Sequence, residues 1–247
     1  MARTLVRTDW NKVDFDKLFL PGLSVDTVIF GFHDSRLMVL LLQYKNTNEF
    51  ALPGGLIRKK ESGDDAAQRV LKDRIGLTDI YLEQFHTFAD PDRSDPSFFR
   101  KIMKARQMEP GPGHFLLQRF VSIGYYALVD FTKAVPVSDG LADECKWHDL
   151  KKLPTLIQDH NQIVKTALSS LRSNLDKKLV GFNLLSELFT MGELQDVYET
   201  VLNEKFRRTS FQRKMLNLGI LKKVDKKWTG GAHKAPFLYT LVPNEKQ

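Results

Sequence analysis

The amino-acid sequence predicts an α+β protein of two domains, residues 1–175 and 176–247. Three observations support this prediction. In the first domain, strand-forming segments are interspersed with two helical patterns, which is typical of a mixed sheet with flanking helices. Near residue 176 the pattern changes to short helices followed by a hairpin. From residue 203 to 234 there are ten basic and two acidic residues, a net charge of +8, whereas the whole chain of 247 residues carries +7.

The first elements are two strands joined by a tight turn. Residues 27–32 and 37–43 are mostly apolar and rich in β-branched types, and residues 33–35 supply the turn. Apolar residues at helical spacing then predict a helix within 61–74. Gly76 follows where a left-handed residue ends a helix, so the order is hairpin, loop, helix.

Two further strands are predicted within residues 80–88 and 119–131. The segment between them, 89–118, is rich in Pro, Gly and charged residues, and it is predicted to be a functional or flexible loop. A second amphipathic helix follows at 159–175, and Asp159 and His160 are expected to cap its start.

The cysteine count and the hydropathy pattern limit the environment of the protein. Cys145 is the single cysteine, so no intrachain disulfide can form and a reducing compartment is indicated. The apolar runs are of strand length, without a signal-peptide or membrane-spanning segment. We therefore expect a cytoplasmic protein that has no membrane partner.

The second domain begins with helical signals. A short helix is predicted at 183–189, and Thr190 and Glu193 have the spacing of a capping box that starts another helix. In the next helix, within 210–219, Phe211, Met215 and Leu218 are expected to face inward. Gln212, Arg213, Lys214 and Asn217 point outward. The segment that follows reads as strand, Gly-rich basic turn and strand.

This order of helix, helix and hairpin predicts a winged helix-turn-helix that binds double-stranded DNA. The second helix would enter the major groove, while the localised positive charge would neutralise phosphates. A small helical lid with a solvated charged face is the alternative. The candidate DNA-binding residues are Arg207, Arg208, Thr209, Ser210, Gln212, Arg213, Lys214, Lys227, His233 and Lys234.

Residues 55–77, "GLIRKKESGDDAAQRVLKDRIGL", resemble the Nudix box of enzymes that cleave nucleoside diphosphates linked to another moiety. Six residues fall on the family pattern, namely Gly55, Glu61, Arg69, Leu71, Gly76 and Leu77. Where the family has three glutamates, this chain has Val70, Asp73 and Arg74. Those carboxylates hold the divalent cations of the reaction. We therefore expect no enzyme activity, no metal and no cofactor; an active Nudix hydrolase is the alternative.

Further segments, among them "TFADPDR", "YYALVDF" and "LFTMGELQDVYETVL", are similar to Nudix-related transcriptional regulators. That resemblance covers nearly the whole chain and implies a homodimeric repressor that binds operator DNA and responds to a small molecule. A sugar such as L-arabinose is the first expectation for the effector, and ADP-ribose is the second. A DNA-binding protein that needs no ligand is a further alternative.

Six residues are candidates for contact with the effector: Thr27, Gly54, Gly55, Glu61, Asp90 and Arg93. The two glycines let the backbone approach a ligand, although a turn after a strand also explains them. Glu61 can accept hydrogen bonds from sugar hydroxyls. Asp90 and Arg93 are placed to line the mouth of a pocket, with loop capping and a surface ion pair as the alternative.

Overall fold

The structure is a computed structural model that describes residues 14–44, 47–78, 80–105, 111, 113–137, 142–227 and 235–242. Its strands are β1 Phe19–His33, β2 Arg36–Tyr44, β3 Phe50–Ala51, β4 Gly54–Arg58, β5 Tyr81–Phe88, β6 Val121–Val129, β7 Ala142–Asp149, β8 Phe189–Thr190, β9 Leu221–Lys226 and β10 Phe237–Leu241. Its α-helices are α1 Phe15–Leu18, α2 Gly63–Ile75, α3 Pro96–Ala105, α4 His160–Leu175, α5 Met191–Leu202 and α6 Arg208–Asn217. Short 3-10 helices are η2 Pro91–Arg93, η3 Phe115–Leu117, η4 Leu150–Lys152 and η5 Val180–Leu184.

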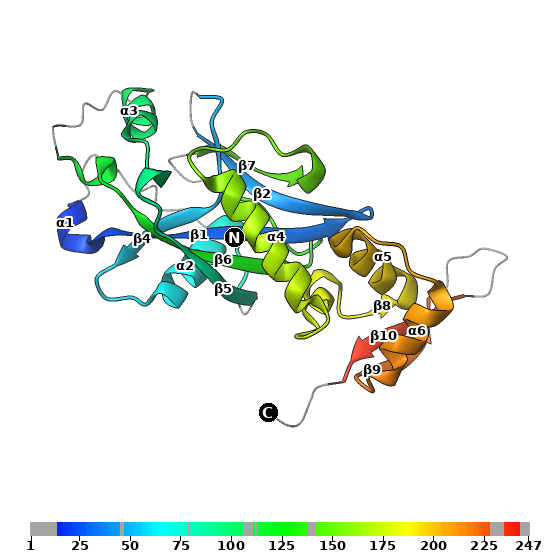
Figure 1. The fold of residues 1–247 in the computed structure, drawn as a ribbon. Coiled ribbons are helices and arrows are strands. Elements are labelled where there is room, and N and C mark those ends of the chain that lie inside the picture. The colour runs from blue at the N-terminus through cyan, green and yellow to red at the C-terminus, as the bar shows by residue number, and fades with distance from the viewer. Residues whose placement is uncertain are drawn as a thin grey trace.

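A seven-stranded mixed sheet forms the first part of the molecule (Figure 1). Its order is β3-β2-β1-β6-β5, with β4 also paired to β1 and β7 to β2. The long strand β1 is parallel to β6 and antiparallel to β2 and β4. β1 and β6 are central, and residues 25–31 of β1 and most of β6 are buried because helices cover both faces.

Helix α2 packs on one face of the sheet and α4 on the other (Figure 1). Side chains of a strand alternate between its two faces, so the neighbouring residues Tyr125 and Tyr126 enter different clusters. Tyr125 packs with Ala66 and Ala67 of α2, whereas Tyr126 belongs to the cluster that contains the apolar side of α4. The sheet is therefore covered on both sides, as the predicted α+β class requires.

The local predictions for this part are largely confirmed. The hairpin turn lies at Asp34 and Ser35, which adopt φ angles of 47° and 53°. Helix α2 ends at Gly76 with φ 70° in the left-handed region. The prediction of an irregular segment 89–118 was wrong for α3, a ten-residue helix anchored by buried Ile102 and Met103. The sequence pattern did not indicate this helix, because the prolines and glycines on both sides of it are typical of a loop.

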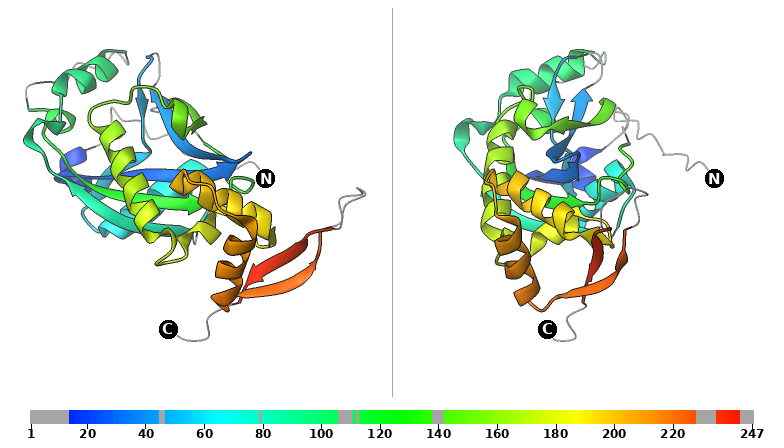
Figure 2. Two further views of the ribbon diagram at one scale, coloured as in Figure 1. Left: turned by 45° about the vertical axis from the view of Figure 1, so that its right-hand side comes forward. Right: turned by 90° about the vertical axis from the view of Figure 1, so that its right-hand side faces the viewer.

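The second part has the architecture of a winged helix, with α5, α6 and a three-stranded sheet in the order β8-β10-β9. The capping box of Thr190 and Glu193 is present at the start of α5. The short helix predicted at 183–189 was wrong, because a 3-10 turn ends at Leu184 and β8 begins at Phe189. Figure 2 shows the hairpin of β9 and β10 projecting away from the larger sheet.

One apolar cluster runs through both parts of the molecule. It contains Val28 and Phe30 of β1, the inner side of α4, and Tyr198, Phe211 and Met215 of α5 and α6. Burial of this kind contributes roughly 25 cal/mol per Å² of apolar surface removed from water, so the two parts stabilise each other. Of the helices that the structure describes, none combines the length and hydrophobicity needed to span a lipid bilayer.

Candidate functional site

The positions that match the Nudix box run from β4 through the following loop and α2 to the two residues after that helix. Glu61 accepts hydrogen bonds from the backbone N–H of Arg58 at 2.8 Å and from Nε of Arg69 at 3.1 Å, and it also binds Nη2 of Arg69. Partial burial alone would raise the pKa of Glu61, but these bonds hold it below its usual range. Glu61 is thus ionised, and its oxygens are already bound by the backbone of Arg58 and the guanidinium of Arg69.

The three positions that replace family glutamates offer little to a divalent cation. Val70 is buried and packs against Gly55, where a Cβ on the glycine would lie 3.2 Å from a Val70 methyl group. Asp73 is exposed, and Arg74 is buried with its positive charge. Among the described residues, no three His, Cys, Asp or Glu side chains gather closely enough to hold a metal ion. The side chains at these three positions, one of them apolar and one cationic, do not fit the magnesium site of the Nudix enzymes.

A buried arginine connects three distant segments. The Arg93 side chain is 2% exposed, and it donates from Nε and Nη2 to the two carboxylate oxygens of Asp159 at 2.8 and 3.0 Å. Nη1 donates to the carbonyl of Phe120 at 3.0 Å, and Asp26 of β1 lies 3.6 Å from Nη2. This two-pronged arrangement matches the planar guanidinium. Arg93 is therefore a buried ion-pair residue and not the surface pair considered from sequence.

His160 completes this cluster. Its Nδ1 accepts a hydrogen bond from the backbone N–H of Leu52 at 3.0 Å, and its Nε2 lies 3.8 Å from Asp26 Oδ1. Burial lowers the pKa of His160, so the imidazole is neutral near pH 7. The expectation that Asp159 caps α4 with its side chain was wrong, because that carboxylate binds Arg93 instead.

Gly54 permits the close approach of two strands beside this cluster. A Cβ at this position would lie 2.6 Å from Asp26 Oδ1 and 2.8 Å from the carbonyl oxygen of Val25. Only glycine leaves that space open. Thr27, also on β1, is fully buried, and its backbone N–H donates to the carbonyl of Pro53 at 2.8 Å.

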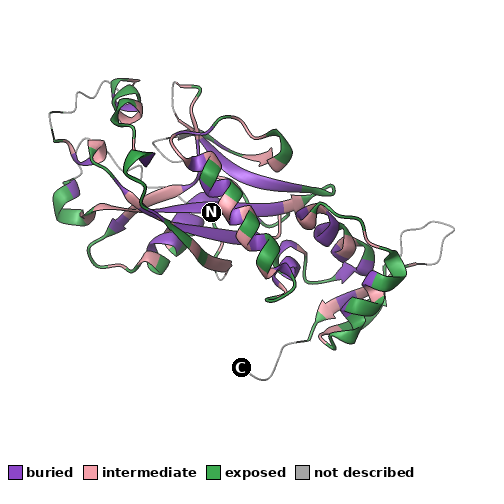
Figure 3. Cartoon of the chain, in the orientation of Figure 1, coloured by how far each residue is buried: buried purple, intermediate pink, exposed green. Residues whose placement is uncertain are grey.

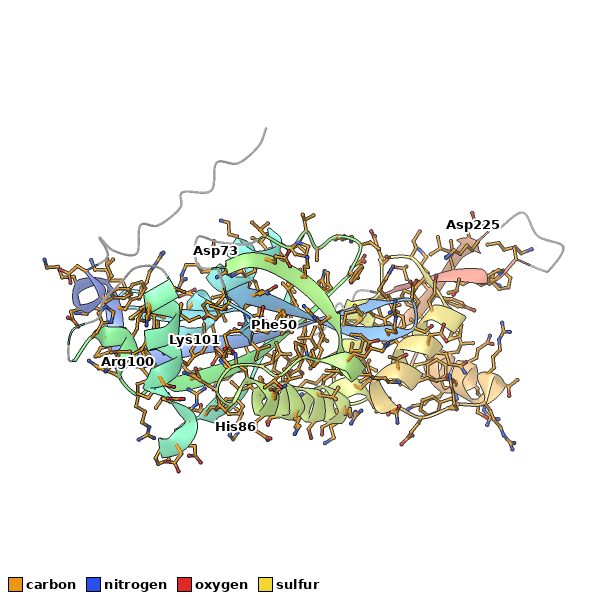
Figure 4. All side chains as sticks on the ribbon, turned by 90° about the horizontal axis from the view of Figure 1, so that it is seen from above. Phe50, Asp73, His86, Arg100, Lys101 and Asp225 are labelled. Atoms are coloured by element: carbon orange, nitrogen blue, oxygen red, sulfur yellow. The ribbon has the colours of Figure 1, made fainter. Side chains whose placement is uncertain are left out.

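A cavity of about 750 Å³ opens beside Arg93, a volume typical of small-molecule sites. It lies between the end of β5, η2 and the start of α4, and Figure 4 shows His86 next to α4. Its lining residues are His86, Thr87, Phe88, Ala89, Asp90, Asp92, Arg93, Asp159, Gln162 and Thr166. Two of the predicted effector residues, Asp90 and Arg93, are in this lining.

The other four predicted effector residues lie elsewhere. Gly55 and Glu61 are on the side of α2, whereas Thr27 and Gly54 lie in the sheet next to Asp26. Asp73 of α2 and His86 lie on opposite sides of the molecule in Figure 4, so the Nudix box and the cavity are separate features. Sequence reasoning missed the other eight cavity residues, namely His86, Thr87, Phe88, Ala89, Asp92, Asp159, Gln162 and Thr166. Of these residues, the sequence pattern indicates only Gln162 and Thr166, because they lie on the polar side of the predicted amphipathic helix.

Helix α6 presents the predicted DNA-binding side chains to solvent. Phe211 and Met215 are buried, whereas the residues between and before them are largely exposed (Figure 3). The exposed group comprises Arg207, Arg208, Thr209, Ser210, Arg213 and Lys214, and Gln212 is half-buried. The expectation that Leu218 faces inward was wrong; it is 41% exposed. Because α6 ends at Asn217, Leu218 lies beyond the last helical turn.

Two candidate DNA-binding lysines form ion pairs. Lys214 contacts Asp176 at 2.8 Å, and Lys227 contacts Glu193 at 2.7 Å. The predicted residues His233 and Lys234 lie outside the described residues. Three exposed arginines are not part of any ion pair within the described residues, namely Arg207, Arg208 and Arg213. Their guanidinium groups can therefore contact phosphates or bases.

The turn between α5 and α6 is held by one carboxylate. Glu199 accepts hydrogen bonds from Gln195 Nε2 at 2.7 Å and from the backbone N–H of Phe206 at 3.0 Å, and it pairs with Lys205. These donors, Gln195 first, lower the pKa of Glu199 to about 2. Ionised Glu199 therefore links α5 to the turn that leads into α6.

We expect the winged helix to lose stability in acid because of Glu199. The pKa is depressed in the folded state, so its contribution is complete above about pH 4.3, the value for an unfolded glutamate, and decreases toward pH 2. Glu199→Gln should lower the free energy of unfolding at pH 7 by about 1–3 kcal/mol and flatten its dependence between these pH values. Urea unfolding followed by circular dichroism measures both. The exposed neighbour Glu204→Gln is the control, and an equal pH dependence in the two variants would contradict the assignment.

The fold defines a mixed α+β domain with an open cavity, joined to a winged helix that exposes several basic side chains. Residues 20–167 match the NUDIX domain family, and residues 181–241 match the NrtR DNA-binding winged helix domain. The chain thus belongs to the NUDIX domain family and is a Nudix-related transcriptional regulator.

Known proteins resemble the chain over most of its length. The ADPR responsive transcriptional repressor NtrR of Acinetobacter baylyi is 26% identical over 222 residues, which cover 87% of this chain and 80% of that protein. The crystal structure of Shewanella oneidensis NrtR complexed with a 27mer DNA superimposes with a TM-score of 0.69 at 29% identity, covering 90% of this chain and 94% of that one. The ADP-ribose pyrophosphatase of Methanocaldococcus jannaschii is 28% identical over 153 residues, 60% of this chain and 75% of that enzyme.

These relatives confirm the predicted regulator and its winged helix. They do not support L-arabinose, the effector expected first. The repressor relative is named for its response to ADP-ribose, so the comparisons favour the second expectation. The sequence led to the sugar because the degenerate Nudix box suggested that a diphosphate would not be held.

Proposed function

We propose that this protein is a repressor that binds operator DNA through its winged helix and leaves the operator when ADP-ribose binds. The observation that carries the proposal is the likeness, over nine tenths of the chain, to an NrtR structure that contains DNA. The exposed cations of α6 and the response named for the Acinetobacter relative support it. We assign DNA binding to residues 176–247 and effector binding to residues 1–175, and we expect the active form to be a homodimer.

The proposed reader of the operator is α6. Arg213 and Gln212 have donor groups suited to base edges, whereas lysines contact phosphates without reading sequence. Arg207, Arg208, Thr209 and Ser210 surround the amino-terminal end of the helix, where backbone N–H groups favour a phosphate. Lys214 and Lys227 lie on the same unit, and we include His233 and Lys234 in the proposed wing contacts.

The proposed effector site is the cavity beside Arg93. Phe88 and His86 offer aromatic surface to a purine, and Gln162 and Thr166 offer hydrogen bonds to ribose hydroxyls. Three aspartates against one arginine make the cavity acidic, so it suits the ring and hydroxyl portions of ADP-ribose better than the diphosphate. Thr27, Gly54, Gly55 and Glu61 remain proposed contacts for the part of the ligand outside this cavity.

We propose that the chain binds ADP-ribose without hydrolysing it. Hydrolysis in the Nudix enzymes needs carboxylates that hold divalent cations next to the diphosphate. Val70 supplies none, Arg74 brings a positive charge, and Glu61 is bound by Arg69. The pyrophosphatase relative keeps hydrolysis as the competing function, which a product assay distinguishes.

The test is a titration of ADP-ribose into a complex of the full chain with a duplex that this chain has selected from a random pool. We expect the operator affinity to fall about fivefold to 150-fold, which is the usual range for coupling between two sites. L-Arabinose and AMP serve as controls and should leave the affinity unchanged. Release by L-arabinose alone would refute the assigned effector, and formation of AMP from ADP-ribose with magnesium would refute the absence of hydrolysis.

A further inference from the structure

The segment 168–180 lies between the two family matches and connects the two parts of the molecule. It contains the second half of α4, which contacts α5 directly. Arg172 Nε donates to the carbonyl of Val201 at 2.8 Å, and the Tyr198 hydroxyl donates to the carbonyl of Leu175 at 3.2 Å. The end of α4 is thus fixed to α5 by two hydrogen bonds, each from a side chain to a backbone carbonyl.

The same segment is also fixed to β5 of the large sheet. Glu83 accepts hydrogen bonds from Asn174 Nδ2 at 3.0 Å and from Lys178 Nζ at 2.7 Å. The hydroxyl of Tyr126 donates to the other oxygen of Glu83 at 3.0 Å. The carboxylate is largely surrounded by donors, which keep the pKa of Glu83 low although its burial would raise it.

Both elements that meet at this junction also line the cavity. Strand β5 carries Glu83 near one end and His86 to Phe88 at the other, and α4 carries Gln162 and Thr166 in its first half. A 16-residue helix is about 24 Å long. A ligand that changes the spacing of β5 and α4 therefore displaces groups at their far ends, because close-packed elements move as units.

Beyond the end of α4, one ion pair reaches the proposed recognition helix. Asp176 binds Lys214 Nζ with both carboxylate oxygens, at 2.9 and 2.8 Å. Lys214 also lies 6.0 Å from the centre of the Tyr198 ring. The two charged side chains are 51% and 53% exposed, so the pair can open without a large desolvation cost. Lys214 follows Arg213 directly on α6.

We propose that Asp176 is a positioning residue that withholds Lys214 from the phosphates of the operator, and that effector binding favours this pair while operator binding opens it. This inference rests on the proposed function. The charge of Lys214 is compensated in the free protein by Asp176, and a DNA phosphate must replace that carboxylate. The pair of Lys227 and Glu193 lies within the winged helix and cannot report the state of the cavity.

The test compares variants of the full chain in duplex binding without effector. Asp176→Asn should raise the affinity about twofold to fivefold, as expected for loss of an exposed ion pair that competes with a phosphate. Asp176→Glu keeps the charge and should restore wild-type affinity. Glu187→Gln removes one exposed negative charge from the same unit and is the control for net charge. It should change the affinity less than Asp176→Asn does.

A double-mutant cycle shows whether Asp176 acts through Lys214. In a Lys214→Gln background, Asp176→Asn should no longer raise the affinity. Persistence of its effect there, or equality with Glu187→Gln, would overturn the proposal. Asp176→Asn should also reduce the loss of affinity caused by ADP-ribose, and an undiminished loss would overturn the role in effector response.

The two proposals fail in different ways. If ADP-ribose does not change the operator affinity of the wild-type chain, the proposed function fails. The cycle between Asp176 and Lys214 still gives its result without effector, and it does so on any duplex because phosphates are common to all sequences.

Discussion

Replacing Arg93 by methionine is expected to lower the free energy of unfolding by about 3–5 kcal/mol. The buried guanidinium is the partner of two carboxylates, at 2.8 Å from Asp159 and 3.6 Å from Asp26. Without it, buried Asp26 and partly exposed Asp159 both lose their cationic partner. The variant should also lose its response to ADP-ribose, because Asp159 and the start of α4 form one wall of the cavity. Urea unfolding followed by circular dichroism, together with effector titration, measures both effects.

A matched control exists on the surface of the same domain. Arg36 also faces a carboxylate, Asp34 at 3.7 Å, but its side chain is 50% exposed. Arg36→Met should change the free energy of unfolding by less than about 1 kcal/mol. Arg93→Lys keeps the charge but not the two parallel hydrogen bonds, and should fall between the wild type and Arg93→Met. Similar stabilities of Arg93→Met and Arg36→Met would show that the buried cluster does not stabilise the fold.

Replacing Arg213 by alanine is expected to weaken operator binding by about 1–3 kcal/mol, which is roughly a fivefold to 150-fold loss of affinity. Its side chain is exposed on the outer side of α6, whose inner side is fixed by Phe211 and Met215. Removal of a guanidinium that binds a guanine edge relaxes the sequence preference at one position. The measurement is fluorescence anisotropy on the selected duplex and on duplexes with single base changes.

Arg100→Ala is the control for loss of positive charge. Arg100 lies on α3, and Figure 4 shows it at the opposite end of the molecule from Asp225 of the projecting hairpin. The Arg100→Ala variant should bind the operator with nearly unchanged affinity. If Arg213→Ala weakens binding to every duplex equally, Arg213 contacts a phosphate; if it behaves as Arg100→Ala does, α6 is not the reading helix.

Features that depend on neighbours in the chain were predictable from the sequence. The capping box of Thr190 and Glu193 and the left-handed Gly76 are each decided within a few residues, by backbone groups at the ends of helices. The hairpin turn at Asp34 and Ser35 is of the same kind. The Nudix box was recognisable because its residues have a fixed spacing along one loop and helix.

Features of the candidate sites that depend on distant residues were not predictable. Arg93 and Asp159 are 66 positions apart, and Lys214 and Asp176 are 38 apart. Sequence patterns report the periodicity of one element, whereas the partner of a charge is decided by which elements pack together. The cavity has the same origin, since β5, η2 and α4 only meet in the folded protein.

The sequence by itself determined the two-part architecture, the basic character of the segment that contains α6 and the loss of the family carboxylates, since each follows from residue types at short spacing. The tertiary structure decided that Arg93 is a buried ion-pair residue, that Leu218 is exposed and that the proposed effector cavity lies away from the Nudix box. The physical reason is that burial and charge pairing are properties of the packed chain. They are fixed only when α4 closes over the sheet and brings its two ends to the cavity and to the winged helix.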